Sequence, residues 1–99
     1  MNKDEEAMER AFADMWWKRI YPLSGDRKLT IAFLIRAHDW RPLDAPWWRG
    51  KQVSIIGSDI HGNFFLRHCD GSIRYWDHQK QADEIVASSV VEFCRRIEQ

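Results

Sequence analysis

The 99-residue sequence has few of the residues that cross-link a chain or interrupt it, with two cysteines, three prolines and five glycines. Cys69 and Cys94 lack a C-x-x-C spacing, and free thiols are a simpler interpretation than a disulfide or a zinc site. No apolar run approaches the ~20 residues that span a bilayer, and the N-terminus opens on charged residues instead of a signal-like segment. We therefore expect a cytoplasmic protein of bacterial type with no membrane segment.

The sequence also lacks an excess of either charge, because 15 Lys and Arg residues balance 15 Asp and Glu residues. The charge is unevenly spread, since residues 16–51 carry eight bases and three acids. A hydrophobic fraction of 44% with six tryptophans supplies enough apolar surface for one core. We predict a single domain over residues 1–99.

A β-hairpin is the clearest local feature. Residues 63–69 and 72–76 are rich in aromatic and β-branched residues, and Asp70-Gly71 between them suits a two-residue turn. Such a turn places Arg67 opposite Arg74. The face predicted to join the core then carries four apolar side chains, which are Phe64, Leu66, Ile73 and Tyr75.

Helices are predicted at both ends of the chain. An amphipathic pattern over residues 4–20 indicates an N-terminal helix with its acids in the first turns. Ser89 and Glu92 form the pattern of a capping box and predict the start of a C-terminal helix, although a start near Gln81 is also compatible.

The middle of the chain is less regular. Residues 29–37 contain five consecutive apolar residues that fit a strand or a short buried helix, and we favour the strand. Prolines make residues 39–50 a loop. Residues 53–56 are predicted as a strand that leads into a polar elbow at residues 57–63.

The loop at residues 39–50 contains Trp40, Trp47 and Trp48. Either these rings fold back as a lid on the core or some of them stand exposed as contact residues. We expect at least two to belong to the lid, because tryptophan is highly buried on average and a small domain needs apolar mass.

Four segments of the second half, in order and spacing, resemble the C-terminal half of the SMI1/KNR4 (SUKH) family. They are Ile56-Gly57-Ser58-Asp59, Gly62-Asn63-Phe64-Phe65-Leu66, Gly71-Ser72-Ile73-Arg74-Tyr75-Trp76-Asp77-His78 and Ala87-Ser88-Ser89-Val90-Val91-Glu92-Phe93. The similarity covers about residues 53–97, while the first half is shorter than is usual and lacks the expected second helix.

The resemblance implies an α+β fold with an antiparallel or mixed sheet, a central β-hairpin and a helix at each end. It also implies a non-enzymatic immunity protein that binds a cognate bacterial toxin, often a nuclease, without a cofactor or metal. The residues expected to contact that partner are acids, histidines and tryptophans, namely Asp59, His61, Asp77, His78, Asp83, Glu84, Trp47 and Trp48.

Two other function classes are compatible with particular residues. Asp59, His61, Asp77 and His78 belong to the residue types of a metal site or a general base, although aspartates at strand ends more often shape turns. A small metal-dependent hydrolytic domain is therefore one alternative.

Nucleic-acid binding is the other alternative, because basic residues and tryptophans share residues 16–51. The bases there are Lys18, Arg19, Arg27, Lys28, Arg36, Arg41, Arg49 and Lys51. The balanced overall charge and the absence of a nucleic-acid motif favour a solvated face instead.

Overall fold

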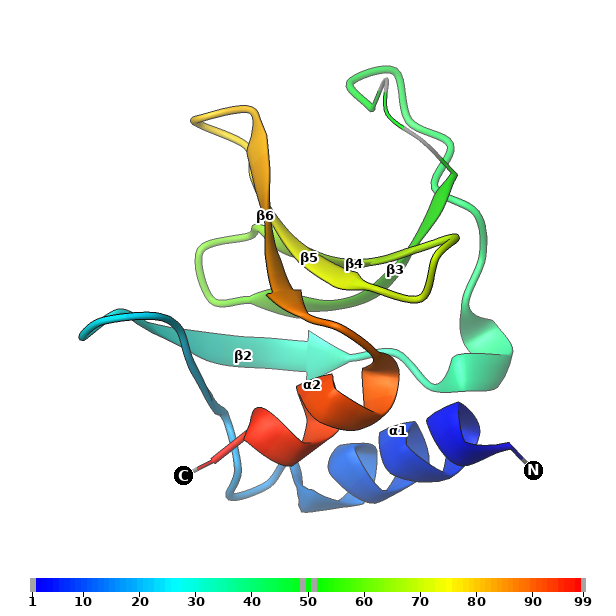
Figure 1. Ribbon diagram of the computed structural model, residues 1–99, viewed down its shortest axis with the longest axis vertical. Helices are drawn as coiled ribbons and strands as arrows, with labels where there is room; N and C mark the ends of the chain where they lie inside the picture. The colour runs from blue at the N-terminus through cyan, green and yellow to red at the C-terminus, as the bar shows by residue number, and fades with distance from the viewer. Residues whose placement is uncertain (1, 49, 51, 99) are drawn as a thin grey trace.

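The computed structural model describes residues 2–48, 50 and 52–98, in which six strands form one antiparallel sheet in chain order (Figure 1). The strands are β1 (Ile20–Pro22), β2 (Lys28–Leu34), β3 (Val53–Asp59), β4 (Phe64–His68), β5 (Ile73–Asp77) and β6 (Ala82–Ala87). Helix α1 (Lys3–Asp14) and helix α2 (Val90–Arg96) flank this sheet. The predicted α+β class, the central hairpin and the two terminal helices are confirmed.

The sheet is strongly curled, and Figure 1 shows β3 to β6 rising away from β2 as an incomplete barrel. Irregularities in strand pairing occur between Ile31 and Phe33, between Ile55 and Gly57, and beside Ile73. Bulges of this kind bend a strand and increase its twist. Gly57 is needed at one of them, because a Cβ there would lie 2.8 Å from the Phe33 carbonyl oxygen.

Both helices pack on the same side of the sheet and against each other (Figure 1). The Asn2 side chain accepts a hydrogen bond from the Glu5 amide and caps α1, whose predicted end at residue 20 is wrong. The helix ends at Asp14, because Ile20 is needed in β1, where its backbone exchanges two 2.7 Å hydrogen bonds with Glu98. The predicted start of α2 is confirmed, since the Ser89 hydroxyl accepts from the Glu92 amide at 3.1 Å.

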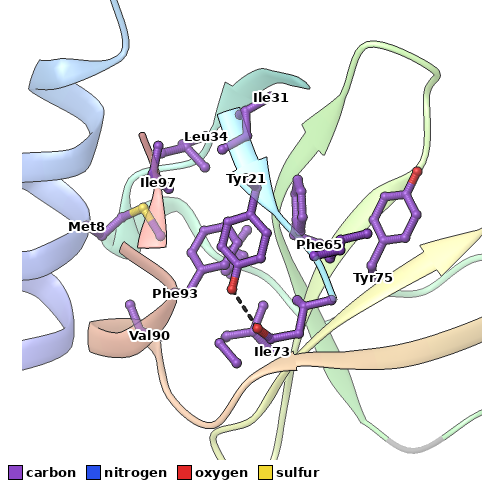
Figure 2. Close-up of a cluster of buried hydrophobic side chains, with 14 residues drawn as sticks. Met8, Tyr21, Ile31, Leu34, Phe65, Ile73, Tyr75, Val90, Phe93 and Ile97 are labelled. Atoms are coloured by element: carbon purple, nitrogen blue, oxygen red, sulfur yellow. Dashed lines mark hydrogen bonds between the residues drawn. The ribbon is translucent and has the colours of Figure 1, made fainter. Parts of the chain in front are cut away.

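Three aromatic rings form the centre of the core (Figure 2). The ring of Tyr21 lies 4.9 Å from that of Phe93 and 5.8 Å from that of Phe65, between ring centroids. Around them are buried residues from both helices, from β2, β3, β5 and β6, and from the segments next to these elements: Met8, Leu23, Ile31, Leu34, Ile56, Ile73, Tyr75, Val86, Ala87, Val90 and Ile97. We call the sheet surface that contacts this cluster the core face.

The predicted register of the β4–β5 hairpin is wrong by one residue. Phe65 lies opposite Tyr75, and Arg67 lies opposite Ile73 rather than opposite Arg74. The connection holds three residues, because the His68 amide donates to the Ser72 carbonyl and Gly71 adopts a positive φ of 90°. A shift of one residue exchanges the two faces of β4 relative to β5.

The corrected register changes which side chains of β4 share the core. Phe65 enters it, while Phe64 and Leu66 point to the opposite surface of the sheet. Leu66 is nevertheless fully buried, so its burial was predicted but not its location.

The other predictions for the middle of the chain have mixed outcomes. Residues 28–34 form a strand as favoured, and the described residues 40–48 and 50 form a loop that follows a short 3-10 helix, η1 (Ala37–Asp39). Strand β3 continues to Asp59, beyond its predicted end, and β6 was not predicted. None of the described helices has the length and apolar character needed to cross a bilayer.

Candidate protein-binding face

The surface of the sheet opposite the core face carries a layer of aromatic rings. Phe64 of β4 and Trp76 of β5 are directly opposite each other in the hairpin. Trp47 lies nearly parallel over both, with ring centroids 5.9 Å and 6.1 Å away and interplanar angles of 15° and 17°. The Trp47 indole is therefore stacked on the rings of the hairpin and remains 39% exposed.

The loop that carries Trp47 is fixed to β3. The Leu43 amide donates to the Val53 carbonyl at 2.7 Å, and Pro42 forms an isolated bridge with Ser54. Trp48, next in the chain, lies edge-on to Trp76 with 5.3 Å between the ring centroids. We use the name aromatic face for the surface formed by Phe64, Trp76, Trp47, Trp48 and His78.

The three loop tryptophans have different surroundings. Trp40 packs against the core and donates its indole N–H to the Ile35 carbonyl at 2.8 Å. Trp48 is half-buried against the other side of the sheet, and Trp47 is the most exposed of the three. The loop thus covers both surfaces of the sheet at its edge.

Two open hollows flank Trp47, and it is the one described residue that lines both. The Asp77 hollow, of about 690 Å³, is bounded by Trp47, His61, Gly62, Asn63, Phe64, Tyr75, Asp77, His78 and Gln79. The Asp83 hollow, of about 590 Å³, is bounded by Pro46, Trp47, Trp48, Gly50, His68, Arg74, Trp76, Gln81 and Asp83. Each is large enough for side chains of a partner.

Asp77 and His78 lie at the end of β5. One carboxylate oxygen of Asp77, Oδ1, accepts from the amides of Gln79 at 2.9 Å and Lys80 at 3.2 Å, so the side chain shapes the turn into β6. The His78 ring lies 4.7 Å from the ring of Trp47, and its backbone amide donates to the Asn63 side chain at 3.0 Å. Both residues line the Asp77 hollow, as a partner-binding role requires.

Asp59 has an internal role instead. It is buried, its Oδ1 accepts from the amides of His61 at 3.0 Å and Asn63 at 2.9 Å, and its Oδ2 accepts from the Tyr75 hydroxyl. In Figure 2 the Tyr75 hydroxyl points away from the core, toward this elbow. Burial and the hydrogen bond to Asp59 raise the pKa of Tyr75 and keep its phenol protonated. We therefore leave Asp59 out of the contact surface, while His61 is exposed at the elbow and lines the Asp77 hollow.

Asp83 and Glu84 follow in β6, and both are paired within the chain. Asp83 Oδ2 lies 3.4 Å from Arg74 Nη1 and 3.5 Å from His68 Nε2, and the three residues line the Asp83 hollow. Glu84 forms a two-pronged ion pair with Arg27 that includes a 2.5 Å contact. The pair places Glu84 beside β2, away from both hollows.

The described residues contain no group of three or more His, Cys, Asp or Glu side chains arranged to hold a metal. Two of the four residues considered for such a site have separate structural roles. Asp59 bonds to the Tyr75 hydroxyl and to backbone amides, while Asp77 accepts from backbone amides of the turn after β5. Cys69 and Cys94 are free thiols, and burial raises the pKa of Cys94 to about 12.

The basic segment considered for nucleic acid is partly neutralised. Arg27 pairs with Glu84, Arg36 pairs with Glu9, and Lys18 pairs with Asp14. Two further members of that set, at positions 49 and 51, lie outside the described residues.

Phe64 and Trp76 are the members of the aromatic face that the sequence reasoning did not assign to a site. The signal that could have identified them is the cross-strand pairing of the hairpin, which depends on the turn having three residues instead of two.

Comparison of the chain with protein-family models, curated proteins and solved structures finds no match.

Proposed function

We propose that the protein is a non-enzymatic immunity protein that binds and neutralises a bacterial toxin domain through the aromatic face. The observation that carries the proposal is the position of Trp47, which is stacked on two rings and is also exposed to solvent. A tryptophan held rigid in this way loses little conformational freedom on binding and suits an interface anchor. The resemblance of residues 53–97 to SMI1/KNR4 proteins supplies the immunity role.

Charge supports a basic partner at this face. The charged residues that line the two hollows are Asp77, Asp83 and Arg74, which leaves one uncompensated carboxylate in the described part of the surface. Many nuclease toxins carry a cationic cleft for their substrate, and a complementary acidic surface would favour encounter with it.

The direct test is co-expression with the toxin domain encoded in the neighbouring reading frame. We expect wild-type protein to restore growth and to co-purify with the toxin. Trp47→Ala should reduce both, because it removes the anchor and exposes the rings beneath it.

The matched control is Trp16→Ala. Trp16 is 79% exposed and follows α1, on the helix side of the molecule, so its loss should leave protection unchanged. Equal cell death with and without wild-type protein, together with recovery of only nucleic acid from a pull-down, would favour the nucleic-acid alternative.

A further inference from the structure

We infer that the Asp77 hollow receives an arginine side chain of the partner, with its guanidinium on the exposed part of the Trp47 indole and beside the Asp77 carboxylate. This inference rests on the proposed function and specifies the chemistry of its anchor. Two features of the hollow lead to it, a flat aromatic wall and an unmatched negative charge. A third observation is that this chain already places arginine guanidiniums over aromatic rings at other positions.

The aromatic wall is the Trp47 indole. The indole stacks with Phe64 and Trp76, the His78 ring lies tilted beside it with 4.7 Å between the ring centroids, and Trp47 is still 39% exposed. Planar guanidinium groups stack on such faces, and tryptophan gives the strongest attraction to a cation among the aromatic residues.

The negative charge is that of Asp77. One of its oxygens, Oδ1, accepts from the Gln79 and Lys80 amides of the turn, and no described Lys or Arg lies within ion-pair distance of the carboxylate. The Asp83 hollow differs, because Arg74 already lies 3.4 Å from the Asp83 carboxylate there. An anionic group of the partner would be repelled by Asp77. An apolar group would bury the charge of the Asp77 carboxylate without compensation.

The chain itself places arginines over rings in three other positions. Arg36 lies 4.6 Å from the ring centroid of Phe12, Arg96 lies 5.3 Å from that of Tyr21, and Arg67 lies 5.6 Å from that of Trp40. Arg36 and Arg67 combine the ring with a carboxylate, Glu9 or Asp4 respectively. Trp47 and Asp77 offer a guanidinium the same two partners, and no described cation lies over the Trp47 ring.

The test is a titration of the intact, ¹⁵N-labelled protein with the peptide acetyl-Gly-Arg-Gly-amide, followed by NMR. The probe for comparison is acetyl-Gly-citrulline-Gly-amide, which keeps the shape of the side chain but removes its charge. We expect the arginine peptide to shift the Trp47 indole N–H and the His78 and Gln79 amides saturably. The citrulline peptide should bind about tenfold more weakly, because it lacks the cation–π and ionic attraction.

Asp77→Asn should weaken the arginine peptide about fivefold and leave the citrulline peptide unchanged, because the charge is lost. Its Oδ1 remains able to accept from both turn amides, so the hollow keeps its shape. Asp26→Asn, at an exposed position in the β1–β2 turn, is the matched control and should leave the affinity for the arginine peptide within twofold of wild type. Equal affinities for the two peptides, an absence of saturable shifts, or shifts confined to another surface would overturn the inference.

The two proposals fail in different ways. If Trp47→Ala abolishes protection from the toxin while Asp77→Asn retains full toxin affinity, the binding face stands and the arginine anchor does not. If the arginine peptide binds as expected but no toxin domain is bound or neutralised, the hollow is a guanidinium site and the immunity role is wrong.

Discussion

Asp59 organises the elbow at residues 59–63 through hydrogen bonds within the chain. Its carboxylate accepts two backbone amides of the elbow and the Tyr75 hydroxyl from β5. The same elbow supplies Asn63, whose side chain accepts from the His78 amide, so the position of His78 on the aromatic face depends on this network. A buried carboxylate that accepts several hydrogen bonds is costly to remove, because its donors are left without an acceptor.

Replacing Asp59 by alanine should therefore destabilise the protein. Three donors lose their acceptor, and we expect the free energy of unfolding to fall by at least about 2 kcal/mol. The measurement is urea denaturation at neutral pH, with Asp26→Ala as the control. Asp26 is exposed in the β1–β2 turn, so its loss should change stability by less than about 0.5 kcal/mol. Similar midpoints for the two variants would contradict the structural role given to Asp59.

Part of this network was predictable from the sequence. An aspartate at the end of a strand is typical of a side chain that bonds to nearby backbone amides, and the His61 and Asn63 bonds have this local character. The Tyr75 bond spans 16 residues and depends on the register of the β4–β5 hairpin. Because the sequence pattern suggested a two-residue turn, that partnership could not be derived.

At the scale of the elements, the open edge between β1 and β6 is closed by side chains. The Tyr21 hydroxyl donates to the Val86 carbonyl at 2.6 Å, and Arg96 of α2 donates to the same carbonyl at 2.7 Å and to that of Pro22 at 3.2 Å. These bonds join the first strand, the last strand and the last helix. They replace the backbone ladder that would complete a closed barrel.

Tyr21→Phe tests this closure. Loss of the hydrogen bond should lower the free energy of unfolding by about 1 kcal/mol, with Val86 still bonded to Arg96. The variant should also respond differently to alkali. Burial raises the pKa of Tyr21 from 10 to about 12, although the Arg96 guanidinium opposes the shift. The phenol is thus protonated in the fold but ionises more readily when unfolded.

This difference in the pKa of Tyr21 between the folded and the unfolded protein determines how stability changes with pH. The contribution of Tyr21 is fully present below pH 10 and is lost as the pH rises through about 12. Wild-type stability should therefore decline more steeply than that of Tyr21→Phe over this range, with Tyr75 present in both proteins. Parallel stability curves would show that the Tyr21 phenol is not protected by the fold.

Elements with strong local signals were predictable, and elements that depend on pairing were not. Strand β2 has a run of apolar residues, and α2 has a complete cap. Strand β6 contains alanine, aspartate and glutamate, which are poor strand formers. It forms because β5 pairs with it, and because Glu84 and Asp83 form ion pairs with Arg27 and Arg74 respectively. The length of α1 was overestimated because the Ile20 pairing with Glu98 involves residues from opposite ends of the chain.

In the whole molecule, the two surfaces of the sheet are covered by different segments. The core face is covered by α1 and α2 and is buried, while the opposite surface is covered by the loop that carries Trp47 and Trp48. Leu66 is fully buried on this second surface, so the loop excludes water there as well as presenting Trp47. A rigid, partly covered aromatic surface opposite the helices is the arrangement from which the binding proposal follows.

Association kinetics with the toxin domain should separate the contributions of charge and of aromatic contact. Asp77→Asn combined with Asp83→Asn should slow association and weaken its dependence on salt, because the two carboxylates attract a basic partner over about the Debye length. Trp47→Ala should mainly speed dissociation, because loss of an anchor is felt after the complex has formed. Glu6→Gln combined with Glu98→Gln makes the same change in net charge away from the aromatic face, and both positions are exposed. If this control slows association as much as the first pair does, the partner responds to overall charge and the aromatic face does not direct its approach.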